Sequence, residues 1–173
     1  MKITLRPSNN IAKEVMEGIE EQVKLVFHCP VAIKSGFDHL SNAYNAERNQ
    51  YLASKLLECL ATNGKGHDEK IIGIVEVDLY CSQLSYVFGE ADFNSSTAIM
   101  SLCRLRQEYY GLPANKDIFI TRACKETIHE LGHTFGLQHC SNLTCVMHFS
   151  SSLADTDWKE IYFCDKCRPK LRI

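Results

Sequence analysis

Residues 129–140 read HELGHTFGLQHC, and this segment carries the most chemically specific pattern of the chain. His129 and His133 are four positions apart, so on a helix their imidazoles lie on one face and converge. Glu130 is rotated from His129 by about 100° around a helix, which directs its carboxylate beside such a site rather than into it. The spacing therefore predicts a metal bound by both histidines, with Glu130 placed to hold a water molecule on that metal.

The end of the segment offers a third ligand. Gly136 stands three residues after His133, where the helix must end if the chain is to fold back. Glycine accepts the positive φ of such a turn without steric strain, and His139 can then return toward the first two histidines. Three neutral nitrogen ligands leave a fourth tetrahedral position open, which distinguishes a catalytic zinc site from a structural one.

Four cysteines in two clusters follow the histidines. Cys140 directly succeeds His139, Cys145 comes next, and Cys164 and Cys167 form a C-x-x-C pair. Four thiolates grouped in this way fit an all-cysteine zinc site, in which the metal is structural. Two disulfides are the alternative, but the opening MKITLRPSNN lacks the apolar stretch of a signal peptide, so we expect the reducing cytoplasm. The cofactors expected are therefore two zinc ions per chain, one catalytic and one structural.

The other cysteines are scattered and odd in number, which favours free, mostly buried thiols. They are Cys29, Cys59, Cys81, Cys103 and Cys124. Redox sensing by the cysteine clusters is one alternative function, and it would require Cys164 and Cys167 to react while zinc is bound. Thiolates in a closed zinc site should instead be protected.

These motifs together resemble those of the archaemetzincins, a family of metzincin zinc proteases. HELGHTFGLQHC is followed by Cys145-Val146-Met147 and then by CDKC, so the resemblance covers residues 129–167 directly. The upstream segment IIGIVEVDLYCSQLSYVFGEAD is similar in a less specific way. The resemblance implies that Met147 makes a tight turn beneath the catalytic metal. Its flexible apolar side chain would pack beneath the site without coordinating the metal.

Two residues next to Met147 bear on the mechanism. Some metzincins carry a tyrosine two positions after this methionine, where its hydroxyl can assist an oxyanion. Phe149 occupies that position here and has no hydroxyl. His148 is adjacent, but a histidine in such a turn is more often a surface residue, and no catalytic role is predicted for it.

The predicted function is zinc-dependent hydrolysis of peptide bonds by a water that the zinc activates. Glu130 would take the proton as general base and deliver it to the leaving amine. Aminopeptidase action is implied by the resemblance alone. The runner-up is a zinc-stabilised module that binds a peptide without efficient proteolysis; Glu130 argues against it, because a structural site has no use for a carboxylate beside an open position.

Composition narrows the range of partners. Lys and Arg number 19 against 21 Asp and Glu, and without a basic patch no nucleic-acid partner is expected. No apolar stretch approaches the roughly 20 residues of a membrane span, so we expect no membrane partner. The expected partner is a peptide or protein substrate, and the sequence is silent on oligomeric state.

Hydrophobic periodicity places these motifs on secondary structure. β-Branched or alternating apolar runs predict strands at 1–7, 24–33, 71–80, 84–92 and 97–105. Apolar residues at three- and four-residue steps predict helices at 11–23 and at 48–62, the second stopping at Asn63-Gly64. A long helix is expected from Asn115 or Asp117 through the histidine motif.

This order of elements predicts an α/β (α+β) fold. The resemblance implies a metzincin-like arrangement, with a mixed, mostly parallel twisted sheet and an antiparallel edge strand at 84–92 that pairs with substrate. We expect a single catalytic domain over 1–173. Its upper subdomain, 1–136, would hold the sheet and active-site helix, and its lower subdomain, 137–173, the third histidine, the methionine turn and the zinc-binding cysteines.

Overall fold

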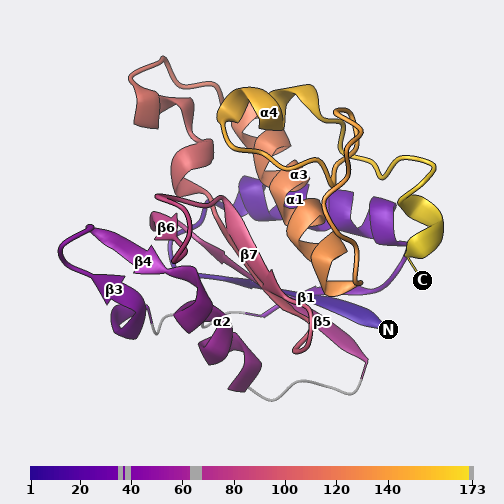
Figure 1. Ribbon diagram of the computed structural model, residues 1–173, viewed down its shortest axis with the longest axis horizontal. Coiled ribbons are helices and arrows are strands. Elements are labelled where there is room, and N and C mark those ends of the chain that lie inside the picture. Colours follow the sequence, from indigo (N-terminus) through magenta and orange to yellow (C-terminus); the bar gives the residue numbers. More distant parts are fainter. Residues whose placement is uncertain (35–36, 38–39, 63–67, 172–173) are drawn as a thin grey trace.

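A mixed sheet of five strands forms the centre of the computed structural model, which describes residues 1–34, 37, 40–62 and 68–171. The strand order is β2-β1-β5-β8-β7. Its strands are β1 (Lys2–Pro7), β2 (Val31–Ile33), β5 (Glu69–Val75), β7 (Gly89–Asp92) and β8 (Thr97–Ser101). All neighbouring strands are parallel except β7, which runs antiparallel to β8 at one edge. Figure 1 shows β7 beside helix α3. The predicted mixed, mostly parallel sheet with an antiparallel edge strand is confirmed.

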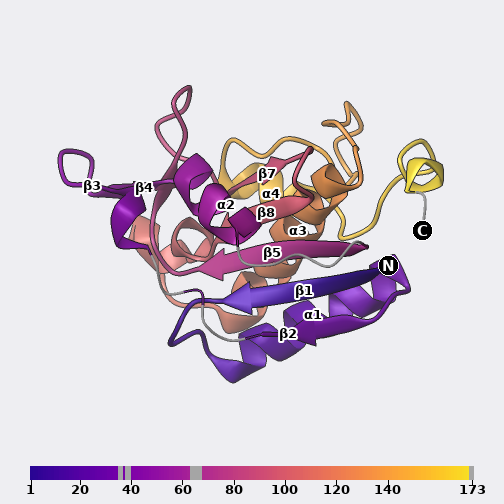
Figure 2. The same cartoon turned by 90° about the horizontal axis from the view of Figure 1, so that it is seen from below.

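Helices cover both faces of this sheet (Figure 2). The long helices α1 (Lys13–Phe27) and α3 (Lys116–Thr134) pack together on one face, and α2 (Ala53–Thr62) lies on the other. A short helix, α4 (Leu153–Trp158), packs against α3. None of the helices in the described ranges is long and apolar enough to cross a membrane.

Smaller elements complete the described chain. A second sheet has the order β3-β4-β6, from β3 (Tyr44–Asn45), β4 (Gln50–Leu52) and β6 (Leu79–Tyr80). Four 3-10 helices are η1 (Ser41–Ala43), η2 (Cys103–Leu105), η3 (Gln107–Tyr110) and η4 (Arg168–Lys170).

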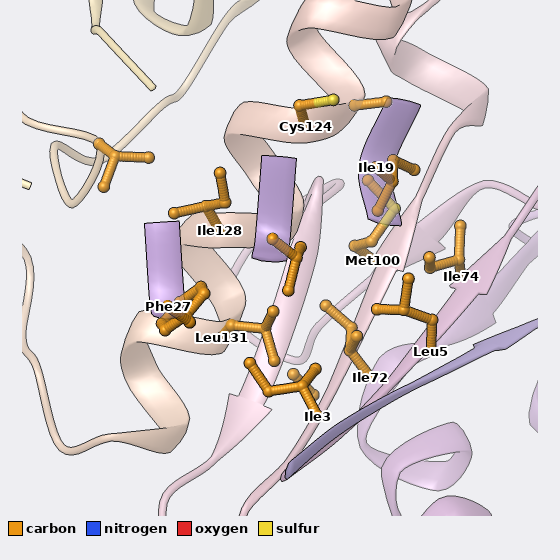
Figure 3. Packing of buried hydrophobic residues seen from close by; sticks show 14 of the residues in the cluster. Ile3, Leu5, Ile19, Phe27, Ile72, Ile74, Met100, Cys124, Ile128 and Leu131 are labelled. Atoms are coloured by element: carbon orange, nitrogen blue, oxygen red, sulfur yellow. The ribbon is translucent and has the colours of Figure 1, made fainter. Parts of the chain in front are cut away.

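The core divides into two layers because side chains alternate across a strand. On β5, Ile72 and Ile74 point into the layer beneath α1 and α3, whereas Ile71 and Val75 point toward α2. Figure 3 shows the first layer, in which strand residues meet helix residues such as Ile128. Burial on both faces explains why β5 is a nearly continuous apolar run rather than an alternating one.

The helix predicted at 11–23 extends further than expected, and the strand predicted at 24–33 is correspondingly wrong. Val23 and Phe27 both lie fully buried and continue the inner face of α1 at four-residue spacing. The helix ends only at His28, whose φ of 48° is left-handed. Just the last three residues of the predicted strand form β2.

The helix predicted at 48–62 begins instead as strand β4 and continues as α2. Tyr51 pairs with Tyr44 on one side and with Leu79 on the other, so long-range strand pairing outweighs helical spacing here. The predicted stop at Asn63-Gly64 lies outside the described residues.

Three further predicted strands are shorter than expected. The segment 71–80 divides between β5 and β6, the segment 84–92 is strand only over β7, and the segment 97–105 turns from β8 into η2. The opening strand and the long helix beginning after Asn115 are confirmed as β1 and α3. Helix α4 was not predicted.

Candidate metal centres

Helix α3 carries two of the three histidines and has defined ends. Asn115 caps its start, with the side-chain oxygen accepting a hydrogen bond from the Ile118 N–H at 3.1 Å. Just past its end, Gly136 adopts a φ of 86°, which only glycine reaches without strain. The chain reverses there and returns to the helix, bringing His139 beside the other two histidines.

The three imidazoles meet at one point. One ring nitrogen from each of His129, His133 and His139 lies within 4.8 Å of the others. The Nε2 atoms of His129 and His133 are 3.1 Å apart. The rings of His139 and His133 have centroids 4.9 Å apart. Three nitrogen atoms this close together fit the ligands of a single metal.

Hydrogen bonds on the far side of two rings select the ligand nitrogen. His129 Nδ1 lies 2.8 Å from the Val146 carbonyl, and His133 Nδ1 lies 2.7 Å from the Leu137 carbonyl. A carbonyl only accepts, so Nδ1 must carry the proton in both rings, and each Nε2 keeps a free lone pair. Both lone pairs are therefore available to the shared point.

The histidines are also held neutral, as metal ligands must be. Burial lowers the pKa of His133 to about 4 and takes the pKa of His129 well below its ordinary value. The pKa of His139 falls as well, first through burial and then through the nearby ammonium of Lys159. All three shifts favour the neutral ring.

Glu130 lies beside these rings in an unusual state. Its side chain is buried, and its Oε2 has no hydrogen-bond partner among the described residues. Burial, and next the neighbouring carboxylate of Glu126, raise the pKa of Glu130. The backbone of Gly89 on β7 packs directly on this side chain: a Cβ at position 89 would lie 2.6 Å from the Cγ of Glu130.

A cavity of about 710 Å³ contains all three histidines and Glu130. One wall is the segment 84–91 leading into and along β7, and another is the loop at 149–151. Most of the lining is apolar, with four aromatic side chains: Tyr86, Phe88, Phe93 and Phe149. The lining also holds three acidic residues, Glu90, Glu126 and Glu130. Burial raises the pKa of Glu90 and of Glu130, which favours their neutral forms, so the cavity combines apolar surface with carboxyl groups that can form hydrogen bonds.

The residues after the third histidine lie close beneath the helix. Met147 is fully buried against Gly132 of α3. Phe149 lines the cavity, with its ring centroid 5.0 Å from that of His139. His148 bonds through Nδ1 to the Cys140 carbonyl at 3.0 Å and is not one of the histidines whose nitrogens converge.

The four clustered cysteines come together as a second group. Their sulfur atoms lie within 4.8 Å of one another, and those of Cys140 and Cys164 are 3.8 Å apart, far beyond a disulfide bond. Burial raises the pKa of Cys145. Burial also acts to raise the pKa of Cys164, but hydrogen bonds from the N–H groups of Lys166 and Cys167, together with those from Cys145 and Cys140, lower it to about 6. A sulfur that accepts N–H hydrogen bonds is stabilised as the thiolate that binds metal.

The two groups are joined through the backbone. His139 and Cys140 are neighbours, and the Cys140 N–H donates to the Met147 carbonyl at 2.9 Å. The five scattered cysteines, all within the described residues, form no disulfide bond, as expected, but only Cys124 among them is buried.

Sequence reasoning missed a buried ion pair beneath the histidines. Lys159 Nζ lies 2.8 Å from Glu126 Oε1, and both side chains are almost fully buried. Glu126 could have been found, because it stands one helical turn before Glu130 and shares its face. Lys159 carries no such signal, since it follows a short helix that the sequence did not predict.

Comparison with known proteins agrees with this geometry. The family model described as peptidase family M54 matches residues 7–173. The archaemetzincin of Methanocaldococcus jannaschii is 40% identical over 173 residues, which cover 99% of this chain and 93% of that protein. The archaemetzincin of Thermococcus kodakarensis is 44% identical over 147 residues, covering 82% of this chain and 78% of its own.

Solved structures give the same result. A zinc-dependent peptidase from Methanocorpusculum labreanum superposes with a TM-score of 0.90 at 32% identity, covering 98% of this chain and all of the other (100%). The archaemetzincin of Methanopyrus kandleri superposes with a TM-score of 0.86 at 36% identity, covering 99% of this chain and 93% of the other. The chain therefore belongs to peptidase family M54, the archaemetzincins, and is a zinc metallopeptidase.

Proposed function

We propose that His129, His133 and His139 hold a catalytic zinc and that Glu130 is the general base for peptide-bond hydrolysis. The observation that carries this proposal is the unpartnered Oε2 of Glu130, a buried oxygen in the same cavity as three neutral imidazoles. A buried carboxylate without a hydrogen bond is costly. A water molecule in the cavity would satisfy it and would be the nucleophile.

The residues of the chain then have distinct tasks. Bound zinc would polarise the scissile carbonyl and acidify a water molecule. Glu130 accepts a proton from water at Oε2 and later delivers it to the departing amine. An extended peptide pairs with the free edge of β7, a strand-addition mode that brings its backbone next to Glu130 at Gly89. Phe149 contributes apolar surface and no hydroxyl.

A second zinc completes the proposal. Cys140, Cys145, Cys164 and Cys167 would hold it in a closed tetrahedral site with a structural role, giving two zinc ions per chain. Gly136 and Met147 support the catalytic site by turning the chain and by packing beneath α3. Because none of the nine cysteines, all of which the structure describes, forms a disulfide bond, we also propose a reducing, cytoplasmic location.

We further propose that residues 1–173 form one metzincin-like catalytic domain. Its upper part, 1–136, holds the sheet and α3, and its lower part, 137–173, holds the third histidine, Met147 and the cysteine site. The cavity lies between the two parts, since both line it. In this division the upper part pairs with the substrate strand, and the lower part supplies the third histidine that completes the metal site.

Glu130→Gln removes the proton acceptor while keeping the shape of the side chain. We expect hydrolysis to slow by about 100- to 10,000-fold, with both metals retained. Mass spectrometry of a mixed peptide library measures the rate, and elemental analysis measures the metals. Unchanged turnover would remove Glu130 from the mechanism. Saturable peptide binding without turnover by the unmodified chain would favour the alternative, a zinc-stabilised peptide-binding module.

Gly89→Ala tests the contact between β7 and the base. The new Cβ would displace the Glu130 side chain, so we expect at least a tenfold loss of kcat without loss of zinc, on the scale of a misplacement of about 1 Å. The matched control is the same change in the Glu130→Gln background. There the base is already absent, so a further loss of equal size would show that Gly89 acts elsewhere.

Cys164→Ser tests whether the cysteine site holds the third histidine in place. We expect zinc at the histidines to bind about tenfold more weakly, although Cys164 does not touch it, because His139 is covalently linked to Cys140. Chelator competition measures the affinity, and Cys59→Ser on α2, across the sheet, is the control. Loss of metal from the cysteine site alone would contradict this coupling.

Acetylating the amino terminus of a short peptide substrate tests for aminopeptidase action. A free amine can donate hydrogen bonds to the carboxyl groups that line the cavity, Glu90 among them. We expect stepwise removal of single residues from the free peptide and little cleavage of its acetylated form, followed by mass spectrometry. Internal cleavage of both forms at similar rates would identify an endopeptidase instead.

A further inference from the structure

The Lys159–Glu126 ion pair is buried where stability alone does not explain it. The side chains of Lys159 and Glu126 are 0% and 3% exposed, and Nζ lies 2.8 Å from Oε1. Burying two charges takes both out of water, and their attraction often fails to offset this, so an apolar pair of similar volume would serve folding as well. The burial of Lys159 and Glu126 beside the three histidines therefore suggests a role at the histidine site.

The lysine ammonium contacts the back of a zinc-binding histidine. Lys159 Nζ is 3.5 Å from His129 Nδ1 and 3.4 Å from the His148 carbonyl. His129 Nδ1 already bonds to the Val146 carbonyl, so Nδ1 carries a proton and cannot accept one from the lysine. The Lys159 ammonium thus lies on the Nδ1 side of the His129 ring, away from the Nε2 atom that faces the metal point. Without Glu126, its positive charge would have no counter-ion there.

Glu126 extends the contact into the cavity wall. The same Oε1 that meets Lys159 also accepts from Thr156 Oγ1 at 3.1 Å and from Ser150 Oγ at 3.4 Å. Ser150 belongs to the loop that lines the cavity after Met147, and Glu126 itself lines the cavity. The pair therefore joins α3, the loop beneath the histidines and the end of α4 at one point.

A neighbouring ion pair joins the same two helices without touching the histidines. Arg122 of α3 donates to both carboxylate oxygens of Asp157 in α4, at 2.7 and 2.6 Å. Lys125 adds bonds from α3 to the carbonyls of Thr156 and Asp157, each at 3.1 Å. Attachment of α4 to α3 is thus provided independently of Lys159.

We propose that Glu126 and Lys159 are positioning residues for the histidine zinc site: their pairing holds His129 and the loop after Met147 in place and cancels the charge behind the ligand. This inference rests on the proposed binding of zinc by the three histidines. The pair would act on the affinity for zinc, and it would affect hydrolysis only through that affinity. Partners of metal-bound histidines typically change metal affinity by about 10- to 100-fold when they are altered.

Glu126→Gln tests the proposal, because it leaves the Lys159 charge behind His129 without its counter-ion. We expect affinity at the histidine site to fall about 10- to 100-fold, while the cysteine site keeps its metal. Cobalt(II) titration separates the two sites, since only the cysteine site gives a thiolate charge-transfer band. Zinc competition with a chelator then measures each affinity.

Asp157→Asn is the matched control. It breaks the other ion pair between α3 and α4, so it should lower Tm while changing affinity at the histidines less than threefold. Glu126→Asp keeps the negative charge and should recover most of the metal affinity that Glu126→Gln loses.

If Glu126→Gln does not fold, Thr156→Val takes its place as the test. This change removes one hydrogen bond to Glu126, and we expect a smaller loss of metal affinity.

Three outcomes would overturn the proposal. Equal losses of metal affinity at the histidines in Glu126→Gln and Asp157→Asn would show that the Glu126–Lys159 pair is only a structural link between helices. Unchanged metal affinity in every Glu126 and Thr156 variant would show that the pair has no role at the histidine site. Absence of metal at the histidines of the unmodified chain would end both this inference and the proposed function. Tight zinc binding without hydrolysis, together with the expected loss of affinity in Glu126→Gln, would instead contradict only the proposed activity and support the positioning role.

Discussion

Three histidines can share one metal only if each ring presents a lone pair to the same point, and much of the lower structure serves this requirement. His129 and His133 each commit Nδ1 to a backbone carbonyl, which leaves Nε2 free. Both carbonyls, those of Val146 and Leu137, belong to the segment that follows the helix. The stretch of chain that brings His139 to this point therefore also orients His129 and His133, and none of the three rings can be placed independently of it.

This arrangement requires a helix with two different buried faces. From Arg122 to Thr134 every residue of α3 is buried, yet many of them are polar or charged. One face, with Ile128 and Leu131, joins the apolar layer over the sheet. The other presents Glu126, His129, Glu130 and His133 to the cavity and to the lower segment. Burial keeps the imidazoles neutral, which metal binding needs, and the same burial makes each unpaired carboxylate or ammonium beside them consequential for the chemistry.

How far prediction from sequence succeeded depends on the range of the interactions involved. The start of α3 at Asn115 and the central strands were predictable, because capping, glycine turns and apolar runs are local signals. The end of α1 was not: Lys24–Phe27 are apolar enough for a strand, and only packing of Phe27 in the core shows them to be helical. Likewise Tyr51 has helical spacing but pairs as a strand with partners distant in the chain.

At the site the same distinction holds. The spacing of HELGHTFGLQHC and of the cysteines specifies which side chains can bind metal, since helix geometry and a glycine turn relate residues that are close in the chain. Contacts between distant segments decided the rest: the carbonyls behind the imidazoles, the approach of Gly89 to Glu130 and the pairing of Lys159 with Glu126. Such contacts form only when separate elements pack together, and no short-range periodicity encodes them.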